Sequence, residues 1–337
     1  GQAAAVDPLP AVTQGTRAHA LHPRARVATW WARPERGDER DGEGNDTRLA
    51  TMSDLVLAVC LGLFSAVTLA AANMSVKMGT DILVGRAILS TSAAVLVLPA
   101  TLFVPLPDAS TWSALSISVP AHFVYQLCVV QAMRRADLSL VFPVMRGVAP
   151  LLTAIAALLF LNESLPPLGW LGLVVATLAV ISFGLPPTGT PLRRHPDGRA
   201  LLWALGTAIG VSLYSVADTR GVRVAPHPLT FIVWLFLVDW ILITSTALVM
   251  RRKVLADAVA NRWRYGVAAG ALSIGSFGAA LYAFSLVETA KVSALRETSV
   301  VFAALMGAHA LGEGLGRRRF LAALALAGGL VLMQFGG

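Results

Sequence analysis

The chain has 337 residues, of which 56% are hydrophobic and only 14% are charged, and its mean hydropathy is +0.68. Ordinary soluble domains carry about 25% charged residues, so this composition excludes a typical soluble protein. The formal net charge is +8, but Lys and Arg gather between apolar runs, where they orient a membrane protein. Nucleic acid is therefore not expected as a partner.

The first 51 residues differ from the rest of the chain. They are rich in Arg, Asp, Gly and Pro and show no helical period, which predicts a disordered tail. The chain begins with Gly1, and Met52 stands immediately before the first apolar run. We interpret the tail as an upstream extension of the reading frame, and we find no pattern of a signal peptide in it.

Ten apolar runs follow, each long enough to cross a hydrocarbon core about 30 Å thick. Short separators rich in turn and charged residues lie between them, as at 104–110, 185–199 and 251–262. The runs are continuous, which favours helices over a β-barrel. The sequence therefore predicts an all-α membrane protein with ten transmembrane helices. The predicted spans are 53–73, 81–104, 113–133, 138–160, 167–185, 200–219, 228–250, 264–287, 290–311 and 318–336.

An internal repeat divides these spans into two sets of five. The stretch VFPVMRGVAPLLTAIAALLFLNESL (141–165) aligns without gaps on KVSALRETSVVFAALMGAHALGEGL (291–315), which places Arg146 on Arg296 and Glu163 on Glu313. We predict a first repeat at 52–185, a linker at 186–199 and a second repeat at 200–337. Because five is odd, the second repeat enters the membrane from the opposite side, which gives an inverted repeat.

The duplicated motif within ten spans resembles the EamA-type members of the drug/metabolite transporter superfamily. The residues that carry the resemblance are PVMRGVAPLLTAIAALLFLNESL in the first half and LRETSVVFAALMGAHALGEGL in the second. The basic residue usual after the motif's Glu is replaced by Ser164 and Gly314, and Val300 stands where the first half has Pro150. The resemblance implies ten helices, no cofactor, and export or exchange of small metabolites.

Arg146 and Arg296 are the first candidates for substrate binding. An unpaired arginine deep in a bilayer costs at least about 2.5–3.5 kcal/mol, so each must face protein or water. The inverted halves would bring both toward the central axis, where we expect them to line a cavity and bind an anionic group, a carboxylate above all. In the structural alternative, Arg296 pairs with Glu288 or Asp218, and Arg146 reaches backbone carbonyls or the interface.

Other polar and aromatic residues inside the spans either join this site or serve only in packing. The substrate-binding candidates are His122, Tyr125, Gln126, Tyr214, Trp234 and Tyr282. A carboxylate withdrawn from water can exchange a proton, and the candidates for such a coupling group are Asp218, Asp239 and Glu288. We expect no metal site.

Three further residues are predicted to act in the scaffold. Pro150 has no amide to donate to the Arg146 carbonyl, so it should kink its helix. Glu163 and Glu313 stand at helix ends, where a carboxylate can bond the free amides of the following helix's first turn and fix a short hairpin.

The leading functional prediction is a secondary transporter that exports or exchanges a small metabolite by alternating access. Its substrate would be amino-acid-like, or another organic anion or zwitterion. The alternatives are a channel or lipid translocase on the same bundle and a membrane scaffold without transport. HExxH, GxSxG, Walker and GxGxxG motifs do not occur as an enzyme would need them, so no enzyme is expected.

The predicted location is a bacterial cytoplasmic (inner) membrane, crossed many times. The Lys and Arg bias of the loops favours both termini outside, whereas the family resemblance favours both inside. The expected partners are a small-molecule substrate and the lipid bilayer, and a homodimer is left open.

Overall fold

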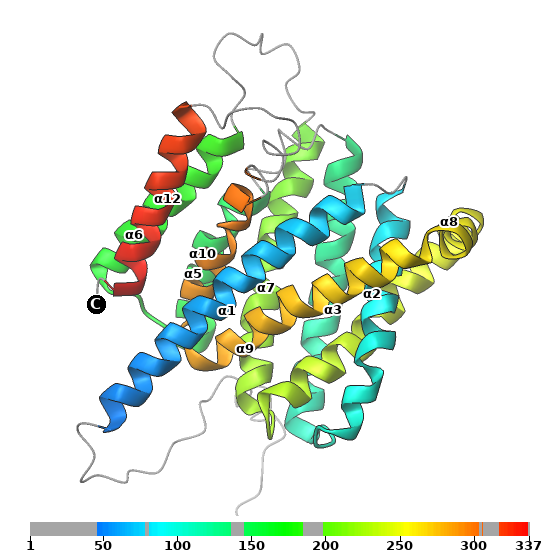
Figure 1. Ribbon diagram of the computed structural model, residues 1–337, viewed down its shortest axis with the longest axis horizontal. Helices are drawn as coiled ribbons and strands as arrows, with labels where there is room; N and C mark the ends of the chain where they lie inside the picture. The colour runs from blue at the N-terminus through cyan, green and yellow to red at the C-terminus, as the bar shows by residue number, and fades with distance from the viewer. Residues whose placement is uncertain are drawn as a thin grey trace, which may run out of the picture. The chain divides into compact units, whose positions relative to one another are not determined.

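The computed structural model describes residues 46–77, 81–135, 145–184, 198–302, 305 and 317–335, all within one compact unit of residues 42–337. Every regular element in these ranges is helical (Figure 1), which confirms the predicted all-α class. The α-helices are α1 (Asp46–Lys77), α2 (Ile82–Val97), α3 (Ala109–Arg135), α5 (Ala149–Leu161), α6 (Pro167–Gly184), α7 (Gly198–Val224), α8 (Pro228–Ser273), α9 (Ala279–Leu286), α10 (Thr289–Arg296) and α12 (Arg317–Phe335). A 3₁₀-helix, η2 (Leu98–Leu102), follows α2, and a π-helix, η3 (Ile274–Gly278), joins α8 to α9.

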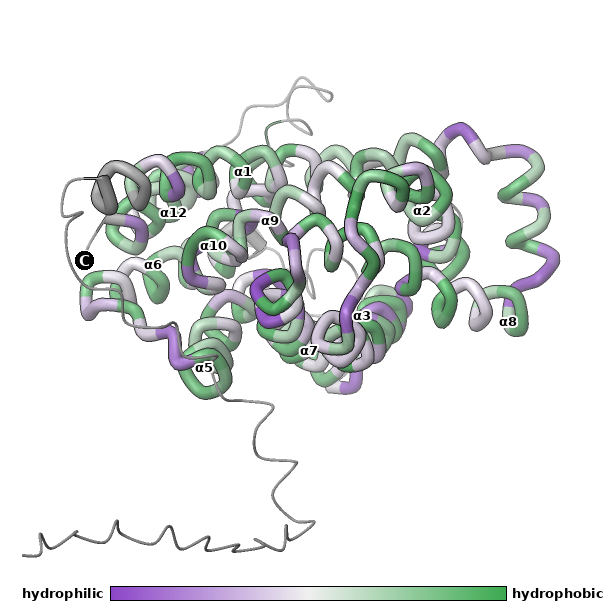
Figure 2. The backbone as a smooth tube through the Cα atoms, turned by 90° about the horizontal axis from the view of Figure 1, so that it is seen from below, coloured by the Kyte–Doolittle hydropathy of each residue, from purple (hydrophilic) through white to green (hydrophobic). Residues whose placement is uncertain are grey.

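Six helical segments in the described ranges are long and apolar enough to cross a membrane. Three shorter apolar helices accompany them, at Met145–Leu161, Pro167–Ser182 and Phe320–Gln334. Hydrophobic residues cover most of the tube, and hydrophilic ones gather at the far end of α8 (Figure 2). The six long segments are Met52–Ala72, Ile82–Leu102, Ala109–Arg135, Gly198–Val224, Pro228–Asn261 and Trp263–Leu286.

The separator predicted at 251–262 is helical and not a loop, because α8 continues through it from Pro228 to Ser273, although one candidate span ends at Asn261 and the next begins at Trp263. The stretch RRKVLADAVANR contains neither Gly nor Pro and is rich in Ala, Leu, Arg and Lys, which favour helix. The charge content of this stretch is typical of a loop, but its residues have a high helix propensity. In Figure 1 the ribbon nevertheless reaches its outermost point near the α8 label and turns back there.

The predicted ends of two other regions also need correction. Residues 46–51, assigned to the disordered tail, are the first residues of α1, while 1–45 lie outside the described residues. Residues 198 and 199, assigned to the linker, begin α7, and 185–197 lie outside the described residues. In the ninth predicted span (290–311), helix α10 ends at Arg296. Beyond Arg296 the structure describes residues 297–302 and 305 of this span.

Contacts between helix ends show which inter-helix segments lie on the same side. Ser110, in the first turn of α3, donates to the Val224 carbonyl at the end of α7, with 3.3 Å between Oγ and O. Glu163, between α5 and α6, lies 2.5 Å from Arg223 and accepts a 2.8 Å hydrogen bond from the Thr289 amide at the start of α10. The segments after the second, fourth, sixth and eighth predicted spans therefore meet.

A separate contact joins the segments after the first and seventh predicted spans. Asp81 caps α2 by accepting from the Leu83 amide at 2.9 Å, and its other carboxylate oxygen lies 3.2 Å from Nε of Arg251 in α8. This ion pair fixes the start of α2 against the middle of α8.

Small residues allow the helices of the two halves to approach closely. α6 packs on α12, α5 on α10 and α2 on α8, and Figure 1 shows α12 lying beside α6. A Cβ at Gly172 would come within 2.4 Å of the Gly329 carbonyl oxygen, and one at Gly270 within 2.8 Å of the Ser92 Cβ. Such backbone approach is how helices associate where lipid supplies no hydrophobic driving force.

Candidate functional site

Arg146 lies just before a break in its helix. The residues 145–147 are helical, the chain bends at Val148, and α5 begins at Ala149 with Pro150 in its first turn. A proline nitrogen cannot donate, so the Arg146 carbonyl loses the helical partner that residue 150 would otherwise supply. The helix is thus interrupted beside the arginine.

Arg296 also lies beside a break, at the matched position of the repeat. Helix α10 ends at Arg296, and the chain makes a turn at Glu297 and Thr298 before a further helical stretch. The Val300 amide donates to the Glu297 carbonyl at 3.0 Å instead of to the Arg296 carbonyl, as it would in a continuous α-helix. The Arg296 carbonyl is therefore open to another donor.

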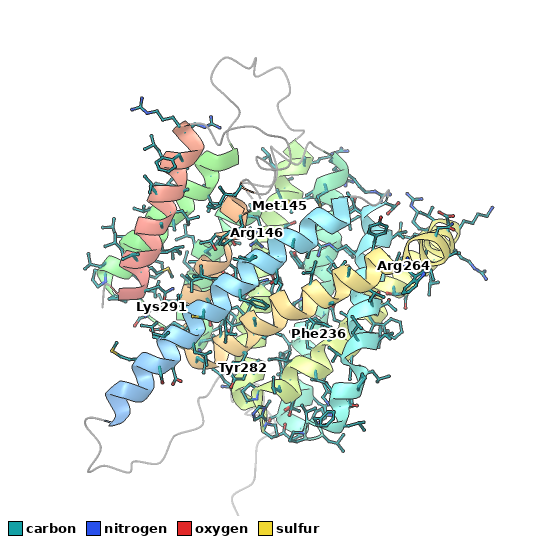
Figure 3. The ribbon with its side chains drawn as sticks, in the orientation of Figure 1. Met145, Arg146, Phe236, Arg264, Tyr282 and Lys291 are labelled. Carbon is teal, nitrogen blue, oxygen red and sulfur yellow. The ribbon has the colours of Figure 1, made fainter. Side chains whose placement is uncertain are left out.

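The Arg146 guanidinium donates a hydrogen bond to the open carbonyl of Arg296. Its Nη2 donates to the Arg296 carbonyl oxygen at 3.4 Å and to the Ser299 hydroxyl at 3.5 Å, and it lies 3.1 Å from Oε1 of Glu297. Figure 3 shows Arg146 beside the helix α10. Arg146 is thus an ion-paired, nearly buried group that connects the two broken helices.

Arg296 has a different environment. It is 7% exposed, its guanidinium carbon lies 5.3 Å from the centre of the Phe277 ring, and its Nε has no hydrogen-bond partner among the described residues. Within those residues neither Asp218 nor Glu288 forms an ion pair with it, since Asp218 bonds to His122 and Glu288 pairs with Lys291. Arg296 therefore keeps a donor for an additional anionic group.

His122 and Asp218 form a buried pair between α3 and α7. The His122 Nε2 atom lies 2.9 Å from one oxygen of Asp218, and the Ser118 hydroxyl donates to the other. The imidazole stacks on Tyr214 with 4.2 Å between ring centres and meets the edge of Phe277 at 5.2 Å. The same Phe277 ring contacts Arg296, so the pair and the arginine share a neighbour.

Tyr125, Gln126 and Asp239 extend this polar region. Tyr125 lies edge-on to Tyr214 at 5.0 Å and has the Arg86 guanidinium over its ring at 5.6 Å. The Gln126 amide donates to Asp239 at 3.2 Å. Together with Arg146 and Arg296, these residues define what we call the polar core: Ser118, His122, Tyr125, Gln126, Arg146, Tyr214, Asp218, Asp239, Phe277, Arg296 and Glu297.

The structure does not bring Trp234, Tyr282 or Glu288 into the polar core. Trp234 packs against Trp112 with 5.4 Å between ring centres, and Tyr282 packs on an apolar cluster. The Glu288 side chain is 38% exposed and lies 3.3 Å from the ammonium of Lys291. Figure 3 shows Tyr282 and Lys291 well apart from Arg146.

Glu163 connects α5 to two more distant helices. Its carboxylate caps α10 through the Thr289 amide, instead of the helix that follows it in the chain, and its other oxygen lies beside Arg223 at an angle that makes no hydrogen bond. Glu313 lies outside the described residues.

Three members of the polar core were not singled out from the sequence. Ser118 precedes His122 by one helical turn, so the shared helix face could have indicated it. Glu297 is an acid beside Arg296 inside an apolar run, which is also a readable signal. Phe277 carries no such signal, because its position depends on how the π-helix η3 meets α3 and α10.

The polar core is closely packed in this conformation. His122, Gln126, Tyr214 and Asp218 are all buried. A gap too narrow for a water molecule lies beside Glu297 and is lined by Gly147, Pro150, Ala176, Thr177, Val180 and Ala294. A substrate would reach Arg296 only after the surrounding helices separate.

Comparisons with known proteins agree with this architecture. Residues 198–335 match the model of the EamA-like transporter family. The second half of the chain is thus similar to the EamA-like transporter family. The family predicted from the repeated motif is thereby confirmed, and a multi-pass membrane protein follows from it together with the six long apolar segments.

A solved structure supports the fold across more of the chain. A crystal structure described only as that of a protein superposes with a TM-score of 0.65, covering 83% of this chain and 96% of the other at 20% sequence identity. At that identity the likeness shows the fold alone. No curated protein matches the chain.

Proposed function

We propose that this EamA-like protein is a secondary transporter that exports or exchanges a small organic metabolite with an anionic group by alternating access. The observation that carries the proposal is the meeting of Arg146 and the Arg296 carbonyl at two broken helices. Transporters of inverted-repeat type place their substrate sites at discontinuous helices near the bilayer midplane.

The contacts support an arrangement of five plus five helices related by inversion. Segments after even-numbered predicted spans meet through Glu163, Arg223 and Thr289, whereas Asp81 and Arg251 join segments after odd-numbered ones. These two groups of contacts are what spans of alternating direction would give. The matched helices α5 and α10, and likewise α6 and α12, pack against each other, as a two-fold axis between the halves requires.

Within the polar core we assign anion binding to Arg296. Its Nε has no hydrogen-bond partner and its guanidinium forms no ion pair among the described residues, so it can bond a carboxylate without first breaking an ion pair. Arg146, held by Glu297, orients the Arg296 backbone. His122, Tyr125 and Tyr214 would then form one wall of the substrate site.

The closed packing around Arg296 favours a carrier over a pore. A channel needs a continuous polar path, but here aromatic rings of Tyr214 and Phe277 cover the polar groups. Opening alternately to each side would expose Arg296 without joining the two solutions.

The test is counterflow into proteoliposomes with four labelled solutes: gluconate, L-glutamate, L-serine and choline. Saturable uptake that is stimulated by the same solute inside supports the carrier. Linear uptake without stimulation would indicate a channel. Reduction of inner-leaflet fluorescent lipid probes by external dithionite would indicate a lipid translocase. No uptake of any solute would contradict transport.

A matched pair of arginine variants tests the site. Arg296→Gln should abolish saturable uptake, because the buried anion donor is lost. Arg264→Gln, at the exposed end of α8 (Figure 3), removes an arginine of equal charge outside the polar core and should leave uptake intact. Equal uptake by wild type and Arg296→Gln would contradict the assigned site.

A further inference from the structure

His122 and Asp218 form a buried, hydrogen-bonded pair that the binding of an anion at Arg296 does not require. The Asp218 side chain is fully buried, and among the described residues its oxygens are hydrogen-bonded to the Ser118 hydroxyl and the His122 imidazole. A carboxylate withdrawn from water is costly unless its charge is compensated. This pair can therefore hold one proton or two, and the two states differ in charge.

One proton must lie between the two groups in either state. Two acceptors would not approach to the observed 2.9 Å, so either Nε2 or the carboxylate carries hydrogen. With that proton on Nε2 and none on Nδ1, the imidazole is neutral, the carboxylate is ionised, and His122 and Asp218 together bear one negative charge. A second proton makes the pair neutral overall, as imidazolium with carboxylate.

The charged and titratable groups that face the pair come from every neighbouring helix. Tyr214 of α7 stacks on the imidazole, and Tyr125 of α3 packs on Tyr214. Asp239 of α8 and Arg296 of α10 interact electrostatically with His122. The remaining charges of this interior are Arg86 of α2 and the Arg146–Glu297 ion pair.

The fixed charges of this interior balance while His122 is neutral. Three arginines, Arg86, Arg146 and Arg296, stand against three carboxylates, Asp218, Asp239 and Glu297. An anion that binds at Arg296 leaves one uncompensated negative charge in a medium where net charge is expensive. One proton taken up by the pair removes that excess.

We propose that the His122–Asp218 pair is the proton site of the transporter, and that it takes up one proton with each monoanionic substrate bound at Arg296. This proposal rests on the transport function proposed above. The proton is bound from the solution to which the site is open and is released with the substrate on the other side. The loaded carrier has the same net charge as the empty one, so transport is electroneutral and coupled to a pH gradient.

The other two acidic coupling candidates lack these features. Asp239 contacts the Gln126 amide and, at 3.5 Å, the Ser90 hydroxyl, neither of which titrates. Glu288 is partly exposed beside Lys291 and lies outside the polar core. Only Asp218 among these three carboxylates is hydrogen-bonded to an imidazole in the described part of the chain.

The test uses proteoliposomes that contain a pH-sensitive dye and receive gluconate or L-glutamate, both monoanions near neutral pH. We expect one proton to enter for each anion taken up. His122→Gln and Asp218→Asn should lose the acidification, whereas Glu288→Gln, which removes a carboxylate outside the polar core, should retain it. Net anion uptake into vesicles without internal anion that is not accompanied by proton entry, or undiminished acidification in both polar-core variants, would overturn the proposal.

Two further outcomes separate this proposal from the transport function. If saturable counterflow occurs only with L-serine or choline, transport stands and proton–anion coupling fails. If no solute shows counterflow, the proposed function itself fails, and the coupling with it.

A measurement on the wild-type protein avoids any folding defect of the variants. Calorimetric titration with the same monoanion in buffers of different ionisation enthalpy counts the protons bound with it. One proton per anion supports the proposal, and none contradicts it.

Discussion

Arg146 and Arg296 occupy matched positions in the repeat but have different partners. Arg146 is neutralised by Glu297 and bonds to backbone, whereas Arg296 faces Phe277 with an unpaired Nε. The sequence could predict that both are buried and near the centre of the chain's spans. It could not predict their difference, because Glu297 follows Arg296 in the chain yet reaches Arg146 across the interface between α5 and α10.

The Arg146–Glu297 ion pair should contribute strongly to the free energy of unfolding. Arg146→Ala would leave a buried carboxylate unpaired, which costs about 3–5 kcal/mol, so the melting temperature in detergent should fall sharply. The double variant Arg146→Ala with Glu297→Ala removes both charges and should lose less than the sum of the single losses. Additive losses in this double-mutant cycle would show that the two charges do not interact.

At the scale of the helices, interruptions are the informative features. The break at Val148 follows from Pro150 and could be predicted, whereas the turn at Glu297 and Thr298 has no proline or glycine to indicate it. The reverse error occurred at 251–262, where charges suggested a loop and the residues' helix preference prevailed. Local sequence therefore predicts breaks caused by backbone chemistry better than breaks caused by tertiary contacts.

Adjacent glycines in α12 give a matched test of close packing. A Cβ added at Gly329 would lie 2.6 Å from the Gly172 carbonyl oxygen of α6, whereas one at Gly328 has no neighbour within 4 Å. Gly329→Ala should cost about 1–3 kcal/mol through forced separation of the backbones. Gly328→Ala should be neutral or mildly stabilising, and thermal unfolding in detergent measures both.

Equal melting temperatures for the two alanine variants would contradict the close backbone contact of α6 and α12.

The cap of α3 should give a pH-dependent contribution to stability. Asp108 accepts from the Thr111 hydroxyl and amide, and these hydrogen bonds, with one from Ser110, lower the pKa of Asp108. A lowered folded-state pKa means that the stabilisation is present above the unfolded-state pKa and is lost as pH falls through the folded-state value. Asp108→Ala should therefore melt lower than wild type at neutral pH, and the difference should narrow below about pH 4.

Asp108→Asn is the control for this cap, since an amide oxygen can still accept from Thr111 without titrating. A wild-type advantage over alanine that stays constant down to acidic pH would contradict the charged cap.

At the scale of the whole chain, counting apolar runs was sufficient to predict the helices but not their lengths or partners. His122, Tyr125 and Gln126, which were grouped from their spacing on α3, all lie in the polar core, because one helix face is readable from sequence; their role in binding stays a prediction. Trp234 and Tyr282 were not excluded, because which face of α8 or α9 meets the polar core depends on packing between halves. The inverted arrangement remains a prediction with a direct test.

Cysteine labelling tests that arrangement. In a background with Cys60 and Cys128 replaced by Ala, single cysteines at Leu106 and Pro226 should react with an impermeant maleimide from one side of the membrane, because their segments meet in the fold. A cysteine at Lys253 should react from the other side, which the loop bias of Lys and Arg makes cytoplasmic. Labelling of Leu106 and Lys253 variants from the same side would contradict the alternation of spans.

The π-helix η3 makes the position of Phe277 sensitive to the deletion of a single residue. An i→i+5 turn accommodates one residue more than an α-helical path between the same two ends, and here the wide turn holds Phe277 against His122 and Arg296. Deleting a single codon within it would restore ordinary winding and rotate the residues on one side of the deletion by about 100° relative to the other. Such a shortened chain could still cross the bilayer. However, the Phe277 ring would no longer lie against both Arg296 and His122.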